Sequence, residues 1–65
     1  MIVTIIGTGL IGGSMALTLK EKGLATKVIG VDVSEQHLTQ ALALGIIDEA
    51  KSLNEAVALS DLIVI

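Results

Sequence analysis

The feature that most constrains the fold of this chain lies near its start, where a glycine-rich turn joins an apolar run to an amphipathic segment. Residues 2–6 are apolar except for Thr4, which is typical of a short strand covered on both faces. Gly7-Thr8-Gly9-Leu10-Ile11-Gly12 follows directly. The segment from Leu10 to Lys22 then has the apolar surface, the late lysines and the closing Gly23 of a helix. The sequence therefore opens with a strand, a tight turn and a helix.

The same alternation of strands and helices continues along the chain. Residues 27–31 are predicted to form a second strand, and Ser34 to cap a second helix that Gly45 closes. Residues 46–50 are expected to form a short third strand or an extended loop. Ser52 and Glu55 have the capping-box spacing, which predicts a short helix ending near residue 59, before a last strand at 61–65.

This order predicts an α/β fold, a Rossmann-like βαβαβ parallel sheet with flanking helices, whose last strand pairs beside the first. The chain stops inside the apolar run 61–65, and a buried strand needs partners on its edges and faces. We therefore expect residues 1–65 to be the N-terminal portion of a doubly wound dinucleotide-binding domain, with the rest of the protein absent. We also expect the chain alone to be poorly stable or self-associating.

Composition excludes several classes of function. A chain that is 52% hydrophobic is not disordered, and one without any aromatic residue lacks the stacking platforms of single-stranded nucleic-acid binders. The net charge of −3 argues against DNA, RNA and anionic membranes as partners. Without cysteine, disulfides, redox chemistry and zinc binding are not expected. No apolar run approaches the roughly 20 residues of a membrane span, so a soluble cytoplasmic protein is the expectation.

The glycine turn has the G-x-G-x-x-G spacing that binds dinucleotides when it follows a strand and opens a helix. Gly7 makes the turn, Gly9 lets a pyrophosphate approach the backbone, and Gly12 lets the helix pack against the strand. The first-turn N–H groups of Leu10 and Ile11 are expected to face the phosphates. The alternative is a glycine turn that only packs a helix on a strand.

Asp32 ends the second strand, 25 positions after Gly7. An acid about 20 residues after the first glycine accepts hydrogen bonds from the adenosine ribose. Its charge would repel a 2′-phosphate, and the chain has no arginine to hold one, so NAD is favoured over NADP as cofactor. The alternative is an exposed turn aspartate.

The remaining polar candidates are interpreted as structural. A surface histidine, a helix hydroxyl and three solvated acids account for the set His37, Ser14, Asp48, Glu49 and Glu55. Met15 is expected to fill core space. Gly13 is unfavourable inside a helix by about 1 kcal/mol. Close approach of a ligand or a neighbouring backbone explains it, or else imperfect packing.

Three segments carry a resemblance to a known family. Gly-Thr-Gly-Leu-Ile-Gly-Gly-Ser at 7–14, Val-Ile-Gly-Val-Asp at 28–32 and Ala-Leu-Gly-Ile-Ile-Asp-Glu-Ala at 43–50 resemble the N-terminus of prephenate and arogenate dehydrogenases. The resemblance implies a longer, homodimeric enzyme that decarboxylates prephenate oxidatively to 4-hydroxyphenylpyruvate in tyrosine biosynthesis, passing hydride to NAD. It implies that the cofactor-binding residues are Gly7, Gly9, Leu10, Ile11, Gly12 and Asp32.

The same resemblance places the catalytic histidine, the substrate-binding arginine and the helical substrate and dimerisation domain in later sequence. The 65 residues alone are therefore expected to be inactive. Three alternatives share the cofactor half: another β-hydroxyacid or imine-type dehydrogenase, a non-catalytic NAD-sensing regulatory domain like those that gate potassium channels, and an inert domain with an empty site. The sequence does not distinguish prephenate from arogenate as the small-molecule substrate.

Overall fold

The computed structural model describes residues 1–7 and 9–65, with the side chains of 10 and 11 outside the description. Strands and helices alternate along it. The elements are β1 (Ile2–Ile6), α1 (Leu10–Glu21), β2 (Lys27–Val31), α2 (Glu35–Ala43), β3 (Glu49–Ala50), α3 (Leu53–Leu59) and β4 (Leu62–Val64). The predicted α/β class is therefore confirmed, including the boundaries of the first two strands.

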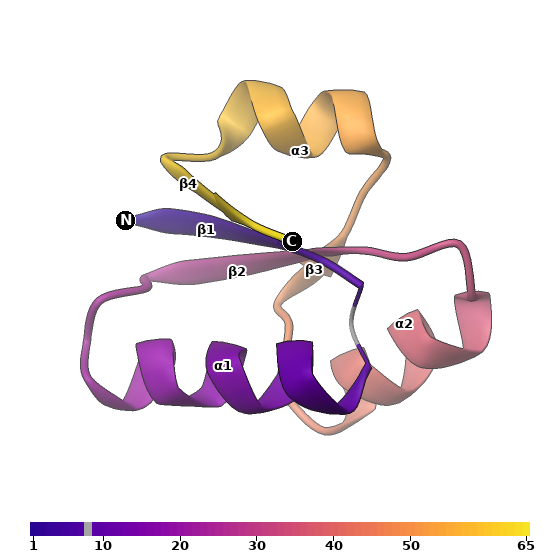
Figure 1. Ribbon diagram of the computed structural model, residues 1–65, viewed down its shortest axis with the longest axis horizontal. Helices are drawn as coiled ribbons and strands as arrows, with labels where there is room; N and C mark the ends of the chain where they lie inside the picture. Colours follow the sequence, from indigo (N-terminus) through magenta and orange to yellow (C-terminus); the bar gives the residue numbers. More distant parts are fainter. Residues whose placement is uncertain (8) are drawn as a thin grey trace.

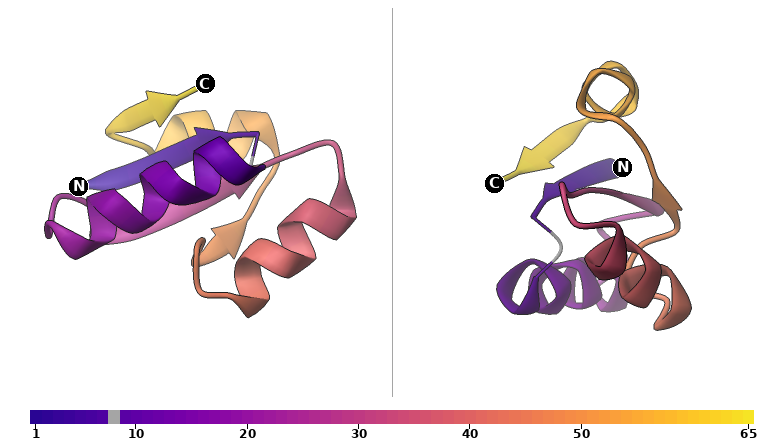
Figure 2. Two further views of the ribbon diagram at one scale, coloured as in Figure 1. Left: turned by 60° about the horizontal axis from the view of Figure 1, so that its bottom comes forward. Right: turned by 90° about the vertical axis from the view of Figure 1, so that its right-hand side faces the viewer.

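The strands form one parallel sheet in the order β3-β2-β1-β4. The helices α1 and α2 cover one face and α3 covers the other, which gives three layers (Figures 1 and 2). The predicted pairing of the last strand beside the first is confirmed, with Val3 opposite Leu62 in the register. The chain moves outward from β1 to β3 and then returns to the other side of β1. A topological switch point therefore lies between β1 and β4, and ligands of open α/β sheets bind outside the carboxyl ends of strands at such points.

The core lies mainly between the sheet and the helices α1 and α2. Alternate residues of β1 and β2 point into it, and the buried set is Val3, Ile5, Ala16, Ala25, Val28, Ala41 and Ile47. The opposite face of β1 buries the hydroxyl of Thr4, which hydrogen-bonds the hydroxyl of Ser60 after α3. Both faces of the central strands are covered, as their apolar sequence predicted.

The helix ends follow their local sequence signals. Gly23 and Gly45 have φ values of 72° and 73°, and each helix closes with the paired backbone bonds of a Schellman motif. The hydroxyl of Ser34 accepts from the backbone of His37, and that of Ser52 accepts from the backbone of Glu55. The Glu55 carboxylate accepts from the Ser52 hydroxyl, at 3.0 Å, so the capping-box pair meets through its side chains.

The structure corrects one sequence-based expectation and adds detail to two others. Met15 does not fill the core, because α1 turns Ala16 and Leu19 toward the sheet and leaves Met15 42% exposed. The third strand is shorter than residues 46–50, because the amides of Ile46 and Ile47 both donate to the carbonyl of Ala41 and close α2.

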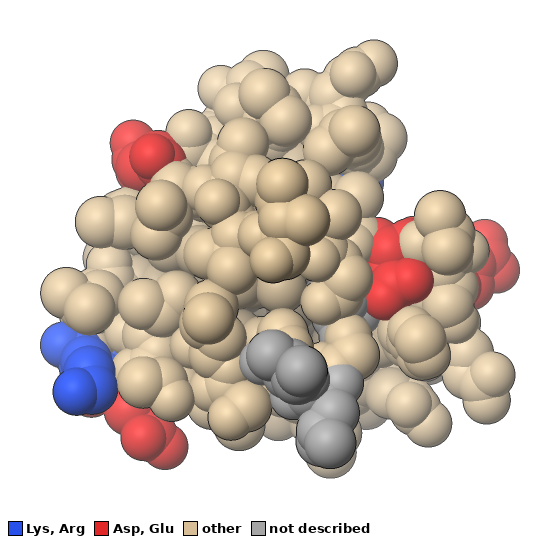
Figure 3. Space-filling model, viewed as in Figure 1, with Lys and Arg blue, Asp and Glu red and all other residues tan. Residues whose placement is uncertain are grey.

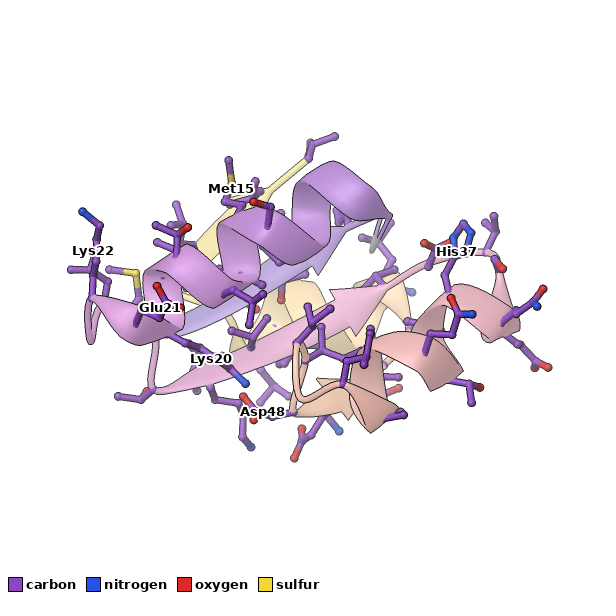
Figure 4. The ribbon with its side chains drawn as sticks, turned by 90° about the horizontal axis from the view of Figure 1, so that it is seen from below. Met15, Lys20, Glu21, Lys22, His37 and Asp48 are labelled. Atoms are coloured by element: carbon purple, nitrogen blue, oxygen red, sulfur yellow. The ribbon has the colours of Figure 1, made fainter. Side chains whose placement is uncertain are left out.

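The second detail concerns two acids expected to be solvated charges, each of which also pairs with a lysine. Asp48 forms an ion pair with Lys20 at 3.0 Å, and Glu49 forms one with Lys27 at 3.0 Å. Figure 4 shows the Lys20 and Asp48 side chains pointing toward one another. No helix in the described part of the chain has the length and apolar character to cross a bilayer.

Candidate functional site

The glycine turn sits at the carboxyl end of β1 and is tied to the neighbouring strand. Gly7 has a φ of 88°, and its N–H donates to the carbonyl of Val31 at 2.8 Å. Gly9 is the N-cap of α1, and its carbonyl accepts from the amide of Gly13 at 2.8 Å. The amides of residues 10–12 belong to the first turn, where a helix offers no internal acceptor. Thr8 lies outside the described residues.

Gly12 allows the close packing that the sequence predicted. A Cβ atom built on Gly12 would lie 2.3 Å from the carbonyl oxygen of Gly7 and 3.0 Å from Cγ2 of Ile5. No real side chain tolerates such a contact with backbone, so only glycine lets α1 approach the end of β1 this closely. The packing role of Gly12 is therefore confirmed.

Gly9 is open on the side where a side chain would project. A Cβ atom built there would meet no described atom within 4 Å, and the backbone has an ordinary extended conformation. Nothing in the described fold thus requires glycine at position 9. Close approach of an external group to the backbone would require it, and a pyrophosphate at the helix N-terminus is such a group.

Gly13 faces a different neighbour. A Cβ atom on this residue would lie 3.4 Å from Cδ1 of Ile46, which is ordinary contact with the end of a side chain. The described structure brings no neighbouring backbone close to Gly13, so that explanation of the glycine is wrong and imperfect packing fits the contact with Ile46.

Asp32 directly follows β2 and lies next to the glycine turn, because its neighbour Val31 accepts the hydrogen bond from Gly7. Its side chain is only 9% exposed. Oδ1 accepts from the amide of Ser34 at 2.9 Å, and Oδ2 lies 3.1 Å from Nδ1 of His37. Asp32 is therefore a turn residue, as the alternative supposed, but it is not exposed. The fold thus brings the glycine turn and Asp32 together at one edge of the sheet.

His37 lies on the surface as predicted, with 52% of its side chain exposed, but its contact with Asp32 was not foreseen. Asp32, Ser34 and His37 occupy positions i, i+2 and i+5 of the local sequence. The signal was present, because a histidine three residues after an N-cap serine lies in the first helical turn, beside the residues that precede the helix.

Charge at this edge is predominantly acidic on the face shown in Figure 3. Acidic side chains gather at the right-hand edge, where Figure 1 places the start of α2, and the clearest lysine patch lies at the opposite edge. Lys20 and Lys22 belong to the far end of α1, and Lys27 begins β2. The ammonium group of Lys51 lies 3.6 Å from Glu49. An anion at the glycine turn would therefore depend on backbone amides rather than on a cluster of cations.

An apolar groove of about 450 Å³ runs between α1 and α2. Gly9 and His37 line it, together with Leu17, Leu44 and Ile46 among others. In the part of the chain that the structure describes, no group of three His, Asp or Glu side chains could hold a metal ion.

Comparison with known proteins gives a consistent result. The family described as "Prephenate dehydrogenase, nucleotide-binding domain" matches residues 15–65. Prephenate dehydrogenase of Bacillus subtilis (strain 168) is 43% identical over 47 residues, which are 72% of this chain and 13% of that protein. The crystal structure of prephenate dehydrogenase from A. aeolicus in complex with hydroxyphenyl propionate and NAD+ matches with a TM-score of 0.75 and 38% identity.

The structural match covers 86% of this chain and 20% of the A. aeolicus chain, so the present sequence spans no more than a fifth of either relative. The family match begins after the glycine turn and includes Asp32 and everything that follows it. It extends over most of the sequence, and the resemblance seen in the sequence is confirmed. The chain belongs to the family of prephenate dehydrogenase nucleotide-binding domains.

Proposed function

We propose that this chain is the NAD-binding part of a prephenate dehydrogenase, the enzyme that converts prephenate oxidatively to 4-hydroxyphenylpyruvate for tyrosine biosynthesis. The observation that carries the proposal is the meeting of the glycine turn and Asp32 at the carboxyl ends of β1 and β2. Family membership and the relative solved with NAD+ support the choice of cofactor.

The binding roles follow from the geometry of the turn. Gly9 leaves the backbone open to the pyrophosphate, and the amides of Leu10 and Ile11 donate to it along the helix dipole. Gly7 and Gly12 hold the turn and helix in place. Asp32 accepts from the adenosine ribose, and its charge disfavours the 2′-phosphate of NADP. Bound NAD supplies the hydride acceptor of the reaction.

We further propose that the residues binding and activating the substrate come from sequence beyond these 65 residues, in a cytoplasmic homodimer. Two observations support the additional sequence. The relatives are about four or more times longer than the chain. In addition, β4 is the last strand of the described sheet and has two half-exposed apolar residues, Leu62 and Ile63, which another strand or helix would cover. The 65 residues alone are thus expected not to turn over prephenate.

The test of the cofactor proposal is Gly9→Ala in the full-length protein. The new methyl group projects into the space proposed for the pyrophosphate, and folding should be unaffected because no described atom lies within 4 Å. Calorimetric titration should show tight NAD and weak NADP binding by the unmodified protein, and at least tenfold weaker NAD binding by the variant. The matched control is Gly13→Ala, which points toward Ile46 and should retain NAD binding.

Two results would count against the proposal. Absence of heat with either dinucleotide in the unmodified protein would contradict the cofactor assignment. NAD binding without turnover of prephenate by the full-length protein would instead favour a regulatory NAD-sensing domain, or a related dehydrogenase acting on another substrate.

A further inference from the structure

We propose that His37 is a positioning residue of the ribose site, and that its Nδ1–H group holds the Asp32 carboxylate in the orientation that receives the ribose hydroxyls. Through that carboxylate it sets the preference for NAD over NADP. The inference rests on the cofactor-binding function proposed above.

The hydrogen-bond chemistry fixes the direction of the contact. Nδ1 of His37 lies 3.1 Å from Oδ2 of Asp32. An ionised carboxylate only accepts hydrogen bonds, so the proton of this bond resides on the imidazole nitrogen. The neutral ring is therefore the Nδ1–H tautomer, which leaves Nε2 without a proton.

The two described bonds hold the carboxylate at both oxygens. The Ser34 amide donates to Oδ1, and His37 donates to Oδ2. Rotation of the carboxylate would break at least one of these bonds. Each oxygen can accept more than one bond, so ribose hydroxyls can donate to the same group while both bonds persist. The carboxylate is thus oriented before a ligand arrives, which lowers the entropy cost of binding.

Local sequence places the imidazole without help from distant residues. The Ser34 hydroxyl caps α2 by accepting from the backbone amide of His37, at 3.3 Å. This cap sets His37 in the first turn of α2, and the same turn returns its ring to Asp32, the residue that directly follows β2. In Figure 4 the labelled His37 lies at the start of α2, at the opposite end of the molecule from Lys22.

The expected consequence for specificity follows from the charge of Asp32. A fixed carboxylate at the ribose favours a free 2′-hydroxyl and repels a 2′-phosphate. A carboxylate that loses the hydrogen bond from His37 is held less firmly in the orientation that receives the ribose. Removal of the imidazole should therefore weaken NAD binding and leave NADP binding unchanged or stronger, so that the ratio of the two affinities falls.

The test compares two replacements of the same side chain in the full-length protein. His37→Leu removes the donor, and one hydrogen bond to a charged group corresponds to a roughly three- to tenfold loss of NAD affinity. His37→Asn presents an amide Nδ2–H close to the former position of Nδ1, and should keep NAD affinity within about twofold of the unmodified protein. Gln36→Ala, at an exposed position of the same helical turn, is the control and should change neither affinity.

If all three variants bind NAD and NADP with the same affinities as the unmodified protein, the inference is overturned. So would equal losses in His37→Leu and His37→Asn, since these would indicate a packing role of the ring. An unmodified protein that binds no NAD would instead contradict the proposed function. A measurement that needs no variant is the ¹⁵N spectrum of the neutral His37 ring, which should show the proton on Nδ1. A proton on Nε2 would overturn the inference.

Discussion

At the scale of single residues, the glycines of the first turn look alike in the sequence and differ in what surrounds them. Gly12 is pressed against the backbone of Gly7, Gly13 contacts the end of one side chain, and Gly9 faces open space. The same substitution at these positions therefore tests packing, helix propensity and ligand approach separately.

We predict opposite effects on stability for alanine at positions 12 and 13. Gly12→Ala forces a methyl group into backbone and should lower the free energy of unfolding by about 2 kcal/mol or more. Gly13→Ala removes glycine from a helix interior, and the new methyl group lies at ordinary contact distance from Ile46. This variant should raise the free energy of unfolding by up to about 1 kcal/mol. Urea denaturation of both variants measures the difference. Similar values for the two would contradict the packing role of Gly12.

At the scale of elements, each of the two outer strands, β3 and β4, is preceded by an aspartate that makes the same pair of hydrogen bonds. The residue just before β3, Asp48, donates its amide to the carbonyl of Val28 and accepts from the amide of Val28 through its carboxylate. Asp61, just before β4, makes the same pair of bonds with Ile2. Each aspartate thus sets the start of an outer strand against an inner one. The sequence shows that each aspartate directly precedes a strand, but it does not show that their partners are Val28 and Ile2.

We predict that Asp48 makes stability depend on pH in the acid range. Burial opposes its ionisation, but the Val28 amide and the Lys20 ammonium together hold the pKa of Asp48 below its ordinary value. Because the unfolded chain then takes up the proton more readily, this stabilisation is present above about pH 4 and is lost as pH falls through the lower folded pKa.

The variant Asp48→Asn tests this prediction. At neutral pH it should lower the free energy of unfolding by about 0.5–1 kcal/mol, a modest figure because the carboxylate is 42% exposed. Its stability should also fall less steeply than that of the unmodified protein below about pH 4. Lys20→Met, which keeps the Val28 bond, should show an intermediate slope. An unchanged slope in Asp48→Asn would contradict the assignment.

At the scale of the whole molecule, apolar side chains remain exposed on the side of α3 and β4. Three of them lie on α3 and two on β4, and each is at least 38% exposed: Leu53, Val57, Leu59, Leu62 and Ile63. Figure 2 shows α3 alone on its face of the sheet and β4 at the open edge. This surface is where the additional elements of the proposed longer domain would pack.

We predict that the 65-residue chain on its own is weakly stable and self-associates through this surface, because exposed apolar residues beside an open strand edge favour pairing between molecules. Sedimentation velocity should show a weight-average mass that rises with concentration. Leu62→Lys, which places a charge on the edge strand, should reduce that rise. A monomer with a sharp two-state melt would contradict the prediction.

What the sequence determined by itself is the structure that depends on near neighbours. The glycine turn, the caps at Ser34, Gly45 and Ser52, and the first two strands were predicted correctly, because φ preferences and capping bonds act over a few residues. The meeting of the turn with Asp32 followed from the general geometry of adjacent parallel strands.

Only the tertiary structure decided the rest. The outward position of Met15 depends on which face of α1 the sheet covers, and the short third strand depends on how α2 closes. The His37–Asp32 contact is the exception, because the local sequence from 32 to 37 sets it and could have predicted it. The Lys20–Asp48 pair, by contrast, joins residues 28 positions apart. Such a pair, like the packed face of a helix, depends on the orientation of one element against another, which propensity and spacing do not specify.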